Sequence, residues 1–249
     1  MPSGGLKRVL VLGGTAEALA LAARLDGLGV PVVTALAGRT PDPALPAGSV
    51  RIGGFGGAEA LARWLREEGI GAVIDATHPF AAAISANALE ACRMAGLPRC
   101  ALVRPPWTEA PGERWLHVAD HEEAAASIPE GARVFLAVGR QAVDHYRGRD
   151  DCAFVIRMIA PPDEGTPPFG TVILGKAGKS VADERALLVE HRIDCLVSKN
   201  SGGRAAHGKI EAARGLAVPV VMIARPPPPD GPCVGTVEAA CAWLREAYS

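Results

Sequence analysis

The sequence lacks any apolar run of about 18 residues, the length that a membrane-spanning helix needs. It also lacks a charged N-terminal region followed by a long apolar stretch and a cleavage site, so it predicts no secretory signal. No excess of either charge is present, because 26 basic and 27 acidic side chains leave a net charge of -1. We therefore expect a cytoplasmic protein with no nucleic-acid or membrane partner, in which a local cluster of cations binds any polyanionic ligand.

Motifs for metal binding and nucleophilic catalysis are also missing. The six cysteines form no C-x-x-C pair and have no zinc-like spacing to histidine, so we expect reduced, mostly buried thiols. His117 and His121 straddle a predicted strand–helix boundary, which argues against a metal site between them. Gly178-Lys179-Ser180 resembles the end of a P-loop, but Ile173 occupies the position where that loop needs its first glycine. The sequence predicts neither a bound metal nor a P-loop NTPase.

The sequence does contain short β-branched runs that alternate with helical stretches, a pattern that predicts parallel sheets covered by helices. Strands are expected at 8–12, 31–36, 50–52, 72–76, 99–103, 115–119, 133–138, 153–159, 171–175, 194–198 and 218–223. Helices are expected at 16–28, 58–68, 80–95, 121–127, 140–146, 180–191, 205–215 and 236–247. We place a domain boundary near residue 129. The prediction is an α/β fold of two Rossmann-like domains, residues 1–129 and a smaller domain at 130–249.

A glycine turn follows the first predicted strand. In open parallel sheets, ligands bind beyond the carboxyl ends of the strands, and Gly13-Gly14-Thr15 followed by a helix N-terminus suits a pyrophosphate. The turn is not a complete G-x-G-x-x-G motif, so an ordinary βα turn is an equally good interpretation of this segment alone.

Arg39 follows the second predicted strand, roughly 20 residues after the glycine turn, where NAD-binding folds place an acidic residue. A guanidinium at this position forms paired, charge-assisted hydrogen bonds with a 2′-phosphate, which favours NADP over NAD. The alternative is a solvated loop arginine.

Two further loops carry candidate site residues in the first half. Residues 53–57 place four glycines around Phe55, which allows close approach of a flat or anionic ligand, whereas a flexible connector has no need of a bulky ring. Asp75 lies at the end of the fourth strand, and Thr77 and His78 follow it. These three residues either cap the following helix and satisfy backbone donors or lie near a nicotinamide, and the sequence leaves both interpretations open.

The second half has one polar cluster at a strand end. Ser198, Lys199, Asn200 and Ser201 follow an apolar strand directly, and such a collection of hydroxyl, amide and cationic donors is suited to an anion. A solvated loop is the alternative. Arg140 follows an earlier strand in a similar but less specific setting.

Together these segments resemble the precorrin-6A reductase family of cobalamin biosynthesis. The resemblance rests on GGTAEA, LAGR, GGFGG, DATHPFA and SKNSGG in that order, with PVVMIARP after them, and it runs from Val9 to about Pro226. It implies an amino-terminal domain that binds NADPH and a tetrapyrrole in the cleft between the domains. The reaction implied is hydride transfer to a carbon of the macrocycle and protonation of its neighbour, which yields precorrin-6B. The substrate is either metal-free or contains cobalt.

The resemblance also assigns site residues. His78 and Lys199 are the candidate proton donors, with bound water as the third possibility. The cofactor contacts implied are Gly13, Gly14, Thr15, Glu17, Ala37, Gly38, Arg39, Gly54, Phe55 and Thr77. Among them, Phe55 with its flanking glycines and Thr77 are expected nearer the nicotinamide and the substrate, as is His78. The substrate contacts expected are Arg104, Arg140, Ser198, Asn200, Ser201 and Lys209. Cations among these would bind the carboxylates of the macrocycle.

Three other functions are compatible with parts of this pattern. An NADP-dependent reductase of another substrate would have the same cofactor-binding features in its first domain. A non-enzymatic NADP-binding sensor would bind the cofactor without turnover. A methyltransferase that uses S-adenosylmethionine also has a glycine loop, but that cofactor has no 2′-phosphate for Arg39 to bind. The oligomeric state stays open, with a monomer favoured.

Overall fold

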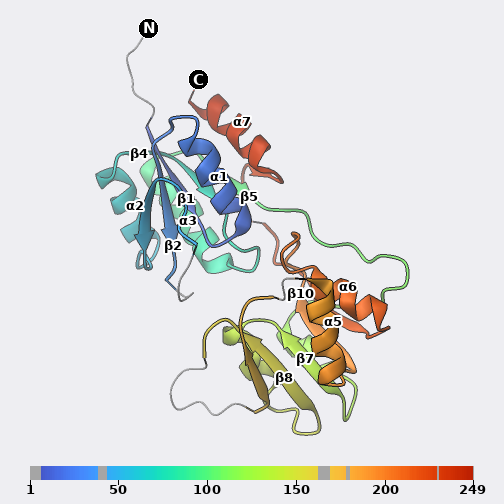
Figure 1. Cartoon of the computed structure of the whole chain (residues 1–249). Coiled ribbons are helices and arrows are strands. Elements are labelled where there is room, and N and C mark those ends of the chain that lie inside the picture. Colours follow the sequence, from blue (N-terminus) through green and yellow to red (C-terminus); the bar gives the residue numbers. More distant parts are fainter. Residues whose placement is uncertain (1–6, 39–43, 162–168, 178–179, 229, 249) are drawn as a thin grey trace. The chain divides into compact units, whose positions relative to one another are not determined.

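The computed structural model describes residues 7–38, 44–161, 169–177, 180–228 and 230–248, and it divides into two compact units (Figure 1). The first unit contains Met1–Pro105 and Pro226–Ser249, and the second contains Pro106–Arg225. Within the described part of the chain, no helix has the length and apolar character needed to cross a membrane.

The first unit is built on a parallel sheet with the strand order β12-β5-β4-β1-β2-β3. In chain order its strands are β1 (Arg8–Leu12), β2 (Val32–Leu36), β3 (Ser49–Ile52), β4 (Ile70–Asp75), β5 (Arg99–Leu102) and β12 (Cys233–Val234). Its helices are α1 (Ala16–Asp26), α2 (Ala58–Glu67), α3 (Ala82–Ala95) and α7 (Val237–Ala247).

Alternate side chains of β1 supply the two cores of this sheet. Val9 and Val11 pack with α1 and α7, whereas Leu10 and Leu12 pack with α2 and α3 on the opposite face. All four are buried, because a central parallel strand is covered on both sides and is therefore apolar throughout.

The second unit has a parallel sheet with the order β6-β11-β10-β7-β8-β9. Its strands are β6 (Trp115–Val118), β7 (Arg133–Ala137), β8 (Ala153–Met158), β9 (Thr171–Leu174), β10 (Cys195–Lys199) and β11 (Val220–Ile223). Its helices are α4 (His121–Ala126), the 3₁₀ helix η1 (Arg140–Tyr146), α5 (Val181–Glu190) and α6 (Gly208–Gly215). Helices α5 and α6 lie side by side (Figure 1), and Leu188 and Ile210 of these helices belong to one core cluster.

The α/β fold with two Rossmann-like parallel sheets, expected from the sequence, is confirmed. The units differ from the predicted domains, because the predicted boundary near residue 129 lies inside the second unit. Strand β6 pairs with β11 in the register Val220↔Trp115, which places it in the second sheet. The chain after residue 225 returns to the first unit, where the two-residue strand β12 pairs with β5. So short a strand gives no periodic signal in the sequence.

Candidate functional site

The glycine turn after β1 is a backbone surface that leads into α1. A Cβ added at Gly13 would lie 2.8 Å from Thr34 Cγ2, whereas one added at Gly14, whose φ is 106°, would meet no atom within 4 Å. Gly13 is thus required by close packing and Gly14 by its backbone conformation. Open space in front of a glycine turn at a helix N-terminus fits a pyrophosphate.

Thr15 connects this turn to the loop after β4. Its side chain accepts a hydrogen bond from the Ala18 N–H at 3.1 Å, as an N-cap does, and its hydroxyl donates to the Ala76 carbonyl at 2.7 Å. The Thr15 side chain therefore links the segments that follow the neighbouring strands β1 and β4.

A buried ion pair shapes the loop after β4. The carboxylate of Asp75 lies 2.9 Å from the guanidinium of Arg99, and both side chains are 3% exposed. The other carboxylate oxygen accepts hydrogen bonds from the N–H and the hydroxyl of Thr77, at 3.2 and 2.7 Å. His78 accepts the Phe80 N–H at Nδ1. Asp75 thus has a structural role, which is to hold Thr77.

The loops after β2 and β3 lie against each other. Gly38 has a φ of 73°, and a Cβ added to it would lie 3.2 Å from Ile52 Cγ2 and 3.9 Å from the Gly53 nitrogen. Phe55 packs edge-on against Trp64 with the ring centroids 5.2 Å apart. The glycine loop is therefore anchored by its aromatic residue. Ala37 precedes Gly38, and Gly54 faces open space, since no atom lies within 4 Å of an added Cβ. Arg39 lies outside the described residues.

Glu17 and Arg104 were assigned to different ligands from the sequence, but the structure brings them together. Their side chains form an ion pair at 2.7 Å, with 25% and 14% of their surfaces exposed. Each charge is therefore compensated by the other, and this pair is a weaker candidate for binding cofactor and substrate than the sequence indicated.

The polar cluster at the carboxyl end of β10 has largely structural contacts. The Asn200 side-chain amide accepts the Trp107 N–H at 2.8 Å and donates to the Trp107 carbonyl at 2.9 Å, while the Trp107 indole donates to the Gly203 carbonyl. Ser198 is fully buried. The Asn200 amide is thus engaged with Trp107, and Ser198 is covered by the protein, so both are weaker candidates for substrate contacts than the sequence indicated. Ser201 is also buried.

Lys209 lies in the core rather than at a ligand surface. Its residue is 5% exposed, its ammonium donates to the Ala206 carbonyl at 2.8 Å, and Nζ lies 4.8 Å from the ring of Trp107. Burial lowers its pKa to about 7. A substrate contact from Lys209 does not fit this environment, because Lys209 is a helix residue whose side chain turns inward.

Lys199 ends β10 close to the loop after β7. Its Nζ would lie 3.8 Å from a Cβ added at Gly139, and burial lowers its pKa. Arg140, which follows Gly139, is exposed and donates to the Pro161 carbonyl at 3.4 Å. Lys199, the last residue of β10, and Arg140, which follows β7, thus lie at the carboxyl ends of neighbouring strands of one sheet.

A titratable cluster near Lys199 was missed from the sequence. His121 Nδ1 lies 2.9 Å from the buried Tyr146 hydroxyl, and the His121 ring stacks on that of His145 with centroids 5.2 Å apart. Burial and the Lys199 ammonium lower the pKa of His121 to about 4. The available signal was its place at the start of α4, three residues after β6 ends.

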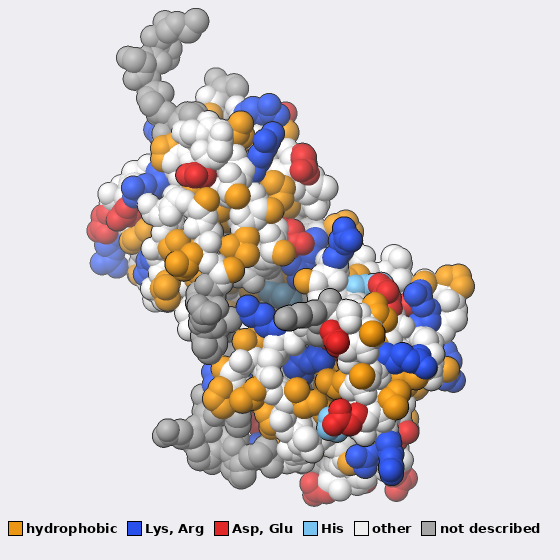
Figure 2. Space-filling view, in the orientation of Figure 1, with side chains coloured by type: hydrophobic (Ala, Val, Ile, Leu, Met, Phe, Trp, Pro, Cys, Tyr) orange, Lys and Arg blue, Asp and Glu red, His pale blue; other side chains and the backbone are white. Residues whose placement is uncertain are grey.

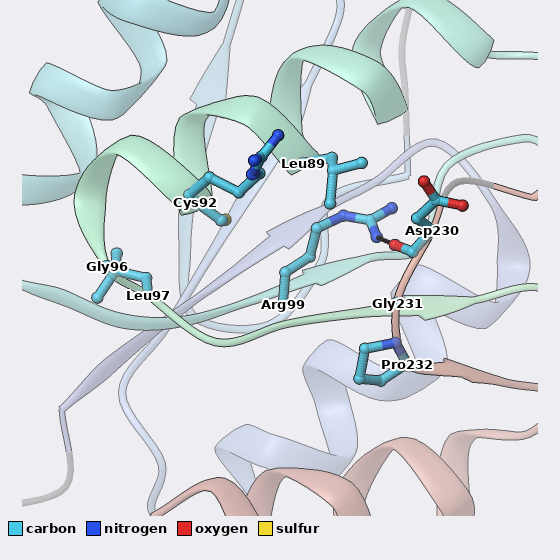
Figure 3. A pocket seen from close by; sticks show the side chains of 9 residues that line it. Leu89, Cys92, Gly96, Leu97, Arg99, Asp230, Gly231 and Pro232 are labelled. Atoms are coloured by element: carbon cyan, nitrogen blue, oxygen red, sulfur yellow. Dashed lines mark hydrogen bonds between the residues drawn. The ribbon is translucent and has the colours of Figure 1, made fainter.

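A separate cavity of about 290 Å³ lies in the first unit, between the end of α3 and the chain before β12 (Figure 3). Figure 3 shows Arg99 donating to the backbone of Asp230 beside Leu89 and Cys92. None of the predicted site residues lines this cavity.

The charge distribution agrees with the composition. On the face shown in Figure 2, basic and acidic side chains are interspersed with apolar ones over both units. The binding of a polyanion by local groups such as Lys199 and Arg140 stays a prediction.

Comparison with known proteins identifies the family. The model of the family described as precorrin-6x reductase CbiJ/CobK matches residues 8–245. The chain belongs to this family. The resemblance found in the motifs is confirmed. Membership in this reductase family implies a nicotinamide cofactor.

Individual members of the precorrin-6x reductase family are similar over nearly the whole chain. The precorrin-6A reductase of Rhodococcus erythropolis is 51% identical, over 96% of this chain and 98% of its own. The cobalt-precorrin-6A reductase of Salmonella typhimurium is 30% identical, over 88% of each chain. A solved structure of CobK precorrin-6A reductase has a TM-score of 0.92 at 41% identity, with 96% of both chains covered.

Proposed function

We propose that this protein is a precorrin-6A reductase that uses NADPH. The reaction adds a hydride to one carbon of the macrocycle and a proton to its neighbour, which gives precorrin-6B. The observation that carries the proposal is the match to precorrin-6A reductases at 51% identity over nearly the full length of both chains.

The glycine turn and the loops beside it would hold the cofactor. Gly13, Gly14 and the N-terminus of α1 suit the pyrophosphate, and Ala37 and Gly38 after β2 would lie at the adenosine end. The sequence resemblance places Phe55 and its flanking glycines nearer the nicotinamide, but β3 lies beside β2, so Gly54 and Phe55 would also lie on the adenosine side. Thr77, fixed by Asp75, would approach the nicotinamide. NADPH supplies the hydride when bound, and the protein's part is to orient it against the acceptor carbon.

Lys199 is the preferred proton donor. Burial lowers its pKa, and an ammonium with a lowered pKa gives up a proton more readily near neutral pH. His78 already accepts the Phe80 N–H at Nδ1, so it is the second candidate, with bound water as the third. Arg140 and Ser201 remain the candidates for contacts with the substrate's carboxylates.

The experiment is anaerobic incubation of the purified protein with NADPH and precorrin-6A, in parallel with the cobalt form. Absorbance spectra and product mass follow turnover. We expect the metal-free substrate to gain two hydrogens, since the similarity is greater to the Rhodococcus erythropolis precorrin-6A reductase than to the Salmonella typhimurium cobalt-precorrin enzyme. Consumption of neither substrate refutes the proposal. NADPH binding without turnover would favour a sensor.

Two variants test the proton donor. Lys199→Met is expected to lower the turnover rate by about 10²-fold or more, the usual contribution of a general acid, with NADPH affinity retained. His78→Gln is the matched variant, and its rate should stay within a few-fold of that of the unaltered protein. A larger loss of turnover rate in His78→Gln than in Lys199→Met assigns the proton to His78. Unchanged rates in both variants assign it to water.

A further inference from the structure

Arg51, in β3, was not singled out from the sequence and has an unusual set of contacts. Its guanidinium donates to the Gly53 carbonyl at 2.6 Å and to the Gly54 carbonyl at 2.9 Å. The guanidinium carbon lies 4.0 Å from the ring centroid of Phe55, a cation–π contact. The aromatic residue of the glycine loop and the loop's own carbonyls therefore hold this side chain in place.

The charge of Arg51 is not compensated by a carboxylate among the residues that the structure describes. Two arginines of the first unit show the contrast, since Arg8 pairs with Glu68 and Arg99 pairs with Asp75. Carbonyl groups accept hydrogen bonds without cancelling a charge. A guanidinium also has five N–H groups, so two hydrogen bonds leave further donors for a ligand.

The position of Arg51 relative to β2 indicates which ligand group it serves. Strands β2 and β3 are parallel, with Ala35 opposite Arg51. At their carboxyl ends, the Gly53 N–H donates to the Leu36 carbonyl at 2.8 Å, and a Cβ added at Gly38 would lie 3.2 Å from Ile52 Cγ2. In nucleotide-binding sheets of this kind, the end of the second strand faces the adenosine ribose, and a nearby arginine accommodates a 2′-phosphate.

We propose that Arg51 binds the 2′-phosphate of the dinucleotide, a role that the sequence alone assigns to Arg39, and so selects the phosphorylated cofactor over the unphosphorylated one. Phe55 keeps the guanidinium in place and leaves the glycine loop open, since added Cβ atoms at Gly53 and Gly54 would meet nothing within 4 Å. A phosphate dianion and a held guanidinium form strong, charge-assisted hydrogen bonds. This inference rests on the proposed use of NADPH and names a residue that determines it.

The test measures equilibrium binding of 2′,5′-ADP and 5′-AMP to the full chain by calorimetry, in the absence of substrate. These probes differ in the 2′-phosphate alone. We expect the unaltered protein to prefer 2′,5′-ADP, and Arg51→Gln to weaken its binding by about 10- to 100-fold, the range for hydrogen bonds to charged groups. Affinity for 5′-AMP should not change. Arg63→Gln, on the exposed side of α2, is the matched control and should retain both affinities.

Arg51→Lys keeps the charge without the planar fork, and we expect its preference to fall between those of the unaltered protein and Arg51→Gln. A preference retained in full by Arg51→Gln overturns the inference and leaves NADPH use intact. Equal weakening of both probes also overturns it, because Arg51 then supports only the loop. No preference in the unaltered protein refutes the use of NADPH itself, and this inference with it.

Discussion

At the scale of single residues, His121 is a half-buried histidine whose surroundings disfavour its charged form. Burial, Lys199 and His145 lower its pKa from 6.5 to about 4, while Glu122 and Asp120 act in the opposite direction. The unfolded chain takes up this proton near pH 6.5, whereas the folded chain does so only near pH 4. Between these values the unfolded state binds more protons, so the free energy of unfolding falls as the pH falls.

The corresponding prediction concerns the slope of stability against pH. Between pH 6.5 and 4, we expect His121→Gln to lose stability less steeply than the unaltered protein, because the histidine's contribution is absent. Urea unfolding at several pH values measures this slope. His117→Gln, at a residue whose side chain is 61% exposed, is the control. Equal slopes for His121→Gln and the unaltered protein would refute the prediction.

At the scale of elements, α5 is fastened to the second sheet by a buried ion pair. Arg157 of β8 contacts Glu184 of α5 through two hydrogen bonds, at 2.8 and 3.0 Å, and the Glu184 side chain is 1% exposed. Removing one partner of such a pair leaves a buried charge. The loss of stability from removing one partner therefore exceeds the net stabilisation that the intact pair provides.

We expect Arg157→Met to lower the free energy of unfolding by about 3 kcal/mol, the lower end of the range for a broken buried pair, because Lys209 still faces Glu184. The double variant Arg157→Met/Glu184→Leu should recover most of this loss. Arg147→Met removes the exposed pair with Asp144 and should cost under about 1 kcal/mol. Urea unfolding measures all three. Equal losses from Arg157→Met and Arg147→Met would contradict this view.

At the scale of the whole molecule, the chain's last segment completes the unit in which the chain begins. Helix α7 packs on α1, and Ala240 and Leu244 belong to the same core cluster as Leu21 and Leu25. The first sheet therefore depends on residues that follow the entire second unit.

Leu244→Ala is accordingly expected to lower the free energy of unfolding by about 2–5 kcal/mol, the usual cost of a cavity at a buried leucine. Leu28→Ala, at a residue that is 52% exposed in the same unit, should change it by less than about 1 kcal/mol. Circular dichroism during urea unfolding compares the two. A loss at Leu244 no larger than that at Leu28 would show that α7 contributes little to this core.

Most of the elements were predictable because their signals are local. Apolar runs mark the buried strands, and Thr15 is an N-cap by residue type and position. The differences between the predicted and the observed elements also have physical causes. Residues 140–146 form a 3₁₀ helix, and the two-residue strand β12 is too short to show a period.

The sequence by itself determined the alternation of strands and helices, the family and the glycine turn, because each depends on neighbouring residues. Only the tertiary structure decided which charges are paired. Glu17 meets Arg104 from 87 positions away, Lys209 turns into the core, and Arg51 keeps a charge that no described carboxylate offsets. Ion pairing and burial depend on distances in space, and spacing along the chain does not report them.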